Sequence, residues 1–186
     1  MSKLNILPAL LIFCSCATTT EQTSDALTES VGPRTPGLYR VLVGSSSCRP
    51  TDGVNPMVWT PNEEPVAGRP VRVEWTTRAM PPFPTDAAVL VSSWQPASGV
   101  FDFTLFGASG CQLLVNMDQL VYIPSGYHDS KLTRQLGSGK IVFEWMPDVS
   151  YVGKSLFMQL LVLSPGQNFA GILASPGLEI FIGSGS

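Results

Sequence analysis

Glycine and proline repeatedly interrupt the apolar runs of this chain. These interruptions constrain its fold more than any other feature of the sequence. The 186 residues include 17 glycines and 16 prolines, and no segment keeps a capped 3.6-residue period, so residues 151–158 hold one helical turn at most. The runs between them are rich in β-branched and aromatic residues, which is typical of strands joined by turns. We predict about ten strands, at residues 38–43, 57–60, 71–76, 87–93, 101–106, 112–115, 120–123, 140–145, 156–163 and 178–182.

The apolar pattern within these strands indicates how they pack. Residues 71–75, 101–105 and 178–182 alternate apolar and polar side chains, as expected for strands with one buried face. Residues 87–91 and 160–163 are apolar on both faces, which places them centrally in the fold or under loops. Closely spaced strands without helices predict an all-β fold, an antiparallel two-sheet sandwich or jelly roll. A barrel is the alternative architecture.

The amino terminus is typical of an export signal. Lys3 precedes about ten mainly apolar residues, a run too short to span a bilayer as a helix. Small residues before and at Ala17 suit cleavage after this position. Alternatively, Ser15 before Cys16 resembles the bacterial lipoprotein box, which would make Cys16 a lipidation candidate, although Phe13 stands where Leu is usual. A short opening helix of a cytosolic protein is the remaining interpretation.

The residues after this signal divide the chain into a linker and one domain. Residues 18–37 are mainly Thr, Ser, Glu, Gln, Pro and Gly, and they contain almost no large apolar side chain. Such a composition buries too little surface to offset the entropy of ordering, so we predict a tether here. We therefore predict a signal peptide at residues 1–17, a tether at 18–37 and a single β-sandwich domain at 38–183.

The four cysteines indicate an oxidising compartment. Cys14 falls in the signal, and Cys16 is removed or acylated, so the mature domain keeps Cys48 and Cys111. Two cysteines in an exported protein predict one disulfide. A metal pair is the competing interpretation, but no CxxC spacing or histidine cluster accompanies them.

Low charge excludes several functional classes. The chain has 11 Lys and Arg against 14 Asp and Glu, for a net charge of -3, and only 13% of its residues are charged. A nucleic-acid partner would need a basic surface, so we expect none. Membrane contact is expected only through a lipid on Cys16. We also expect no metal and no cofactor.

Several segments together resemble a secreted bacterial β-sandwich module that is common in planctomycetes. The module often lies at the carboxyl end of large exported proteins, including some subtilisin-like proteases. The likeness covers residues 38–183, although this chain has a longer polar stretch at 125–139. The matching segments are CRP at 48–50, EPVAGRP at 64–70, GCQLLV at 110–115, VGKSLFMQ at 152–159 and SPGLEIFIG at 175–183. The resemblance implies an extracellular accessory domain with no established activity and supplies no catalytic residues.

Catalytic signatures are sparse. The single histidine, His128, lies between Tyr127 and Asp129 in a polar segment, and no GxSxG elbow accompanies it. We interpret His128 as a solvated loop residue and keep a hydrolase as a remote alternative. The acidic residues are scattered over turns, where aspartate bonds its own nearby backbone. We therefore expect no enzymatic activity.

Aromatic residues are the better candidates for binding. Trp75 lies on the apolar face of its strand, and Trp145 shares a face with other apolar residues, so both are expected in the core. Trp94 and Tyr127 lie near strand ends and loops, where we expect them to be exposed. Exposed rings of this kind suit stacking on sugar rings or contact with a protein partner.

These observations predict an exported, non-enzymatic β-sandwich protein, extracellular or held in the cell envelope as an outer-membrane lipoprotein. It would act as a binding or structural module for an unknown protein or polysaccharide at the cell surface. The alternative is a carbohydrate-binding accessory domain that uses exposed aromatic residues.

Overall fold

Antiparallel strands make up most of the chain described by the structure, a computed structural model. It describes residues 37–42, 48, 56–60, 63–76, 87–124, 126–134 and 139–184. All of them belong to one compact unit, Arg34–Ser186. Among these residues the helices are two short 3₁₀ turns, η1 (Phe103–Phe106) and η2 (Val149–Tyr151), and neither could span a bilayer. The predicted all-β fold is confirmed, whereas the predicted signal and most of the tether lie outside the described residues.

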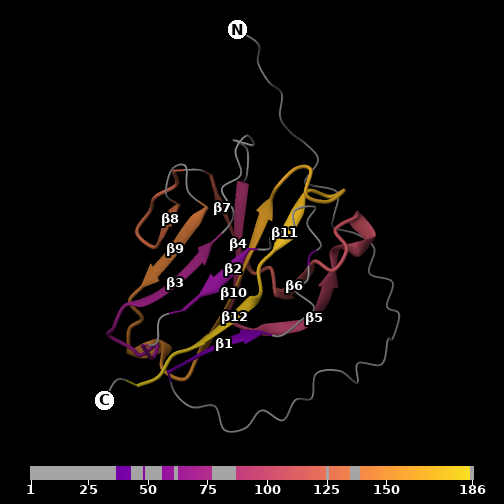
Figure 1. Ribbon diagram of the computed structural model, residues 1–186. Coiled ribbons are helices and arrows are strands. Elements are labelled where there is room, and N and C mark those ends of the chain that lie inside the picture. The colour runs from indigo at the N-terminus through magenta and orange to yellow at the C-terminus, as the bar shows by residue number, and fades with distance from the viewer. Residues whose placement is uncertain are drawn as a thin grey trace. The chain divides into compact units, whose positions relative to one another are not determined.

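Two larger sheets and one hairpin contain all the named strands (Figure 1). Sheet A has the order β1 (Leu38–Leu42), β12 (Gly177–Phe181), β10 (Ser155–Leu163), β4 (Ala87–Ser93) and β7 (Gln119–Ile123), and β11 (Ile172–Ala174) also pairs with β10. Sheet B has the order β2 (Met57–Trp59), β3 (Val71–Thr76), β9 (Lys140–Trp145) and β8 (Leu132–Arg134). The hairpin joins β5 (Pro96–Asp102) to β6 (Gln112–Val115).

The main core fills the space between sheets A and B. Strand β3 alternates between buried and more exposed residues, and its buried Val71, Val73 and Trp75 belong to the same apolar cluster as residues of β10 and β12. Inner-facing residues of β4, β7, β8 and β9 complete this cluster. Two antiparallel sheets packed face to face are a β-sandwich, as the alternating pattern predicts.

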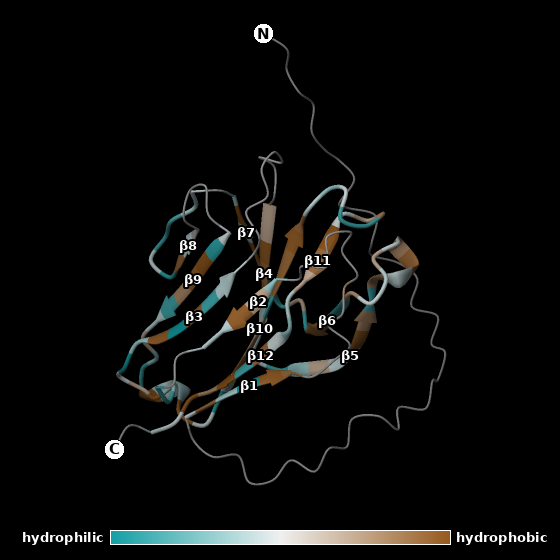
Figure 2. Ribbon diagram, in the orientation of Figure 1, coloured by the Kyte–Doolittle hydropathy of each residue, from teal (hydrophilic) through white to brown (hydrophobic). Residues whose placement is uncertain are grey.

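A second, smaller core lies on the other face of sheet A. Here Val91 of β4 and Phe157 of β10 pack against Leu113 and Val115 of β6. In Figure 1 the central strands β4 and β10 lie between the strands of sheet B and the β5–β6 hairpin. Figure 2 colours β4 almost wholly hydrophobic, whereas β3 alternates. Burial on both faces explains why residues 87–91 and 160–163 are apolar on both faces, as predicted.

One polar side chain joins the hairpin to sheet A. Gln159 of β10 is fully buried, and its Oε1 accepts a hydrogen bond of 2.7 Å from the amide of Leu114. Its Nε2 donates to the carbonyls of Gln112 at 2.8 Å and Ser175 at 2.7 Å. Among the described strands, β6 pairs only with β5. The Gln159 side chain therefore forms the hydrogen bonds to the β6 backbone that a neighbouring strand would otherwise form.

The predicted strands differ from the structure in several places, and the strand predicted at residues 101–106 overlaps only the last two residues of β5 (Pro96–Asp102). The strand predicted at residues 101–106 ends at Asp102, because the Asp102 carboxylate caps η1 by accepting a hydrogen bond of 2.7 Å from the Thr104 amide. Gly107, with φ 83°, then ends this turn. Strands β8 and β11, of three residues each, are missing from the prediction.

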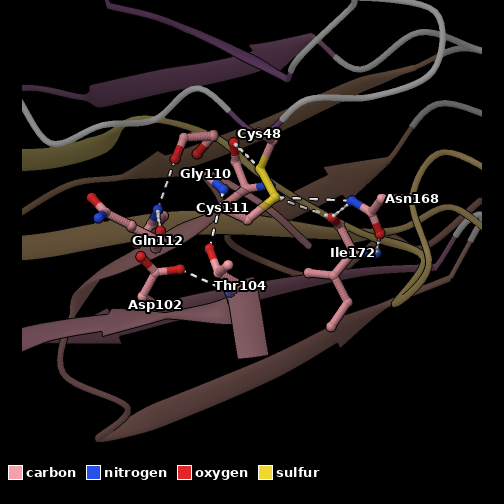
Figure 3. The surroundings of a disulfide bond; sticks show 11 residues. Cys48, Asp102, Thr104, Gly110, Cys111, Gln112, Asn168 and Ile172 are labelled. Carbon is pink, nitrogen blue, oxygen red and sulfur yellow. Dashed lines mark hydrogen bonds between the residues drawn. A yellow bond between two sulfur atoms is a disulfide. The ribbon is translucent and has the colours of Figure 1, made fainter. Parts of the chain in front are cut away.

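The predicted disulfide between Cys48 and Cys111 is confirmed. The two residues are 63 positions apart, so the cross-link stabilises the fold by about 4 kcal/mol in the chain-entropy model. Figure 3 shows Asn168 and Ile172 on one side of the bond, where the Asn168 amide donates to the Ile172 carbonyl at 2.6 Å. The bond therefore ties Cys48, between β1 and β2, to Cys111, which directly precedes β6.

Replacing Gln159 with leucine tests the link between hairpin and sheet. We expect Gln159→Leu to lower the free energy of unfolding by about 3 kcal/mol, because buried backbone groups lose their partners. Urea titration measures this change. Gln95→Leu, at an exposed position, is the control and should change it by less than about 0.5 kcal/mol. Equal stability of the two variants would contradict the role given to Gln159.

Candidate functional site

Three aromatic side chains gather at one end of the sandwich. Trp94 directly follows β4, Trp145 is the last residue of β9, and Tyr151 is the last residue of η2. In β4 the even-numbered residues Ala88 and Leu90 face the main core, so the same alternation carries Trp94 to the mouth of the space between the sheets. The site thus lies where the main core opens to solvent.

The η2 turn places Tyr151 by local hydrogen bonding. Asp148 caps the turn, since its Oδ1 accepts a hydrogen bond of 2.7 Å from the Ser150 amide. Hydrogen bonds from the side chain and the amide of Ser150 lower the pKa of Asp148. Gly153, with φ 78°, then turns the chain into β10, and its amide donates to the carbonyl of Ile182 at 2.9 Å.

The rings form a stack with one perpendicular member. Trp94 stacks on Tyr151 with centroids 5.0 Å apart and planes inclined by 23°. Trp145 meets Tyr151 at 4.9 Å and 85°, and meets Trp94 at 5.9 Å and 72°. The Lys154 ammonium lies over the Tyr151 ring, 5.4 Å from its centroid. Trp94 is 39% exposed, so part of its ring remains open to solvent beside Tyr151.

A cleft of about 180 Å³ opens beside this stack, between the ends of the two sheets. Its floor is apolar and comes from the inner-facing residues of β4, β9 and β10. Its polar lining groups are Ser92, Gln119, Asp129 and Lys131. An apolar floor with a few convergent polar groups is the usual make-up of a small-ligand site. This volume suits one ring-sized group.

The loop that carries Asp129 is organised by that residue. Oδ1 of Asp129 accepts hydrogen bonds from the amides of Lys131 at 2.7 Å and Leu132 at 2.6 Å, and Oδ2 accepts one of 2.8 Å from the Tyr127 hydroxyl. Desolvation raises the pKa of Asp129, but these hydrogen bonds outweigh it, and the pKa lies below its usual value. The same bond to Asp129 raises the pKa of Tyr127. The Asp129 carboxylate therefore stays ionised and holds the loop in place through its hydrogen bonds.

A second hollow, of about 480 Å³, lies on the outer face of sheet B. We call it the outer hollow. Its lining includes His128, Ser130, Thr133 and Glu144, which carry an imidazole, two hydroxyls and a carboxylate. His128 Nδ1 lies 2.9 Å from Oγ1 of Thr133, so Nε2 of the ring has no partner among the described residues. Polar and charged residues make up a larger share of the residues that line this hollow than of those that line the cleft.

The residues singled out from sequence are only partly brought together. Trp94 is exposed, as expected, and it borders the cleft. Tyr127 is half-buried against the main core and takes no part in the described ring stack. Trp75 is fully buried, and Trp145 is half-buried at the edge of the core. Sequence reasoning did not single out Lys131, because only the fold brings it to the same cleft as Trp94.

Among the described side chains, His128 and Asp129 are not joined in a catalytic triad. The described partner of His128 is Thr133, and the carboxylate of Asp129 is held by Tyr127 and two amides, so they do not form a Ser-His-Asp arrangement. Within the described ranges, no group of three His, Cys, Asp or Glu residues is placed to hold a metal ion. The arrangement can bind a ligand by stacking and hydrogen bonding.

Comparison of the chain with models of protein families, with curated proteins and with solved structures finds no match. The resemblance to the planctomycete module stays a prediction that rests on the quoted segments.

The structural role of Asp129 predicts a pH-dependent loss of stability. Asp129→Ala should lower the free energy of unfolding at pH 7 by no more than about 1 kcal/mol, since the carboxylate is solvent-exposed. Folding depresses its pKa below the ordinary value of 3.8, so the contribution is present above that value and is lost as pH falls through the folded pKa. Urea titrations at pH 7 and pH 3 measure the difference in the free energy of unfolding between the unaltered protein and Asp129→Ala, and this difference should be smaller at pH 3. Ser130→Ala is the neighbouring control. A larger difference in the free energy of unfolding at pH 3 than at pH 7 for Asp129→Ala would contradict this account.

Proposed function

We propose that the protein is an exported, non-enzymatic β-sandwich module that binds a ligand at the cell surface. The cleft between the ends of the sheets is the observation that carries this proposal. Trp94 offers an exposed ring face beside a small set of polar groups, which suits recognition. The ligand classes that it suits are a protein partner and a polysaccharide.

The absence of enzymatic activity is part of this proposal. A general acid or base needs a pKa near the working pH and access to substrate. The lowered pKa of Asp129 and its three hydrogen bonds suit a structural group instead. A hydrolase that uses His128 is less well supported, because its described partner is a threonine hydroxyl.

Export is supported by the sequence and is compatible with the disulfide. The apolar run after Lys3, the polar residues 18–37 and the lipoprotein-like context of Cys16 suit export with or without a lipid anchor. The Cys48–Cys111 bond suits an oxidising compartment. Membership in the planctomycete module family would suit the same location.

Fractionation of a bacterial host that expresses the full chain tests the location. We expect the protein in the envelope or the medium. If Cys16 is lipidated, Cys16→Ser moves the protein from the membrane pellet to the soluble fraction, whereas cleavage after Ala17 leaves the distribution unchanged. Cys14→Ser is the matched control. Cytoplasmic retention of the unaltered chain would contradict export.

A carbohydrate-binding accessory domain is the second candidate, and the exposure of the Trp94 ring beside the cleft favours it. The C–H face of a sugar ring packs on the electron-rich face of an aromatic ring. The structure changes the predicted pair of binding residues, since Tyr151 and Trp145 support Trp94 whereas Tyr127 supports the neighbouring loop.

Substitution of Trp94 tests the cleft as the binding site. Trp94→Ala should weaken sugar binding at least about tenfold, because it removes the stacking face, whereas Trp94→Phe should retain part of the affinity. Isothermal titration with neutral polysaccharides measures the change. Trp59→Ala is the matched control, since Trp59 is 56% exposed on β2 and does not line the cleft. Equal losses in Trp94→Ala and Trp59→Ala would contradict the assignment.

A further inference from the structure

The cleft and the outer hollow adjoin each other. Asp129, Lys131 and Trp145 line both of them. The cleft lies between the sheets and the outer hollow lies on the far side of sheet B, so these three residues form a rim over which a ligand can pass. A ligand longer than one ring can thus enter both spaces.

The charges around the rim favour a neutral ligand. Lys131 and Asp129 have opposite signs and line both spaces. The Lys154 ammonium lies 5.4 Å from the centroid of the Tyr151 ring, next to the Trp94 stack, so its positive charge disfavours a cationic ligand group at this stack. In the outer hollow, the Glu144 carboxylate lies 3.8 Å from the Arg72 guanidinium. Because the positive charge of Arg72 offsets the negative charge of Glu144, this carboxylate repels an anion less than an isolated carboxylate would. No sign of charge dominates.

The edge of sheet B disfavours a peptide strand. Strand β8 is the last strand of this sheet, and an open edge strand would invite a peptide to add by main-chain hydrogen bonds. The chain itself already covers this edge, because His128 forms an antiparallel bridge with Thr133 and the Asp129 amide donates to the Leu132 carbonyl at 2.9 Å. The hydroxyls and imidazole of the outer hollow remain for a ligand with hydroxyl groups.

We infer that the cleft and the outer hollow are adjoining subsites for consecutive units of one neutral oligosaccharide. Trp94 stacks on one sugar ring in the cleft, and Ser130, Thr133 and His128 hydrogen-bond the next unit in the outer hollow. This inference rests on the carbohydrate-binding function proposed above, and it specifies a chain as the ligand in place of a single sugar.

Titration with sugars of increasing length tests the two subsites. The probes are the cello-, xylo-, manno- and chito-oligosaccharides of one to six units, measured by isothermal titration on the full chain. For the series that binds, the three-unit sugar should bind at least about tenfold more tightly than the one-unit sugar, because the second contact is intramolecular. Trp94→Ala should weaken both lengths.

Variants in the outer hollow separate the subsites. His128→Ala should bring the ratio of the three-unit to the one-unit affinity toward one, and Thr133→Val, which keeps the size of the side chain, should act in the same direction. Trp59→Ala should leave the ratio as it is in the unaltered chain. The same affinity for one and three units, or an unchanged ratio in both outer-hollow variants, would overturn this inference and leave carbohydrate binding in place. Failure of every series to bind would overturn this inference together with the carbohydrate function, and export would still stand on fractionation.

Discussion

Burial of the central strands of sheet A, β4 and β10, on both faces is the constraint on which the rest of the structure depends. Strand β10 contacts the main core through Met158 and Leu160 and the smaller core through Phe157. A strand in this position has no solvated face, so a polar residue on it must find its partners inside the protein. Gln159 does so by bonding the backbone of β6. The amide therefore fixes the position of the hairpin over the sheet as well as satisfying its own polar atoms.

This double burial also explains where a ligand site can form. The hairpin covers β4 and β10 on the outer face of sheet A, and sheet B covers their inner face, so the ends of the sandwich are where the main core can open. Trp94 follows β4 in the inward register, and Tyr151 is held beside it by the capped turn that precedes β10. Packing thus fixes the aromatic stack at this end, and the cleft is an extension of the core.

Much of this fold could be predicted from local patterns, because a period of two marks a half-buried strand. Strands β3, β4, β6 and β9 have the predicted bounds. The wrong end predicted for the fifth strand has a different cause, since Phe103, Leu105 and Phe106 continue an apolar pattern and only the Asp102 cap diverts the chain into a turn.

The site was harder to predict than the fold. Exposure of Trp94 follows from its place at a strand end, but its stacking on Tyr151 joins residues that are far apart in sequence. No local signal encodes such a contact, because sheet topology determines it. Tyr127 shows the converse, since its place in a polar loop suggested exposure, whereas its ring packs against the core and its hydroxyl bonds Asp129.

The low charge of the chain has a specific structural consequence. Only 13% of the residues are charged, and several aspartates act on their own backbone: Asp102 caps η1, Asp148 caps η2 and Asp129 closes the loop beside the cleft. Each has a lowered pKa because hydrogen bonds favour its ionised form. Carboxylates held in this way are poor proton donors near neutral pH. Near the aromatic stack, Asp129 and Asp148 therefore shape loops, and the binding that we propose relies on ring faces, hydroxyls and one imidazole.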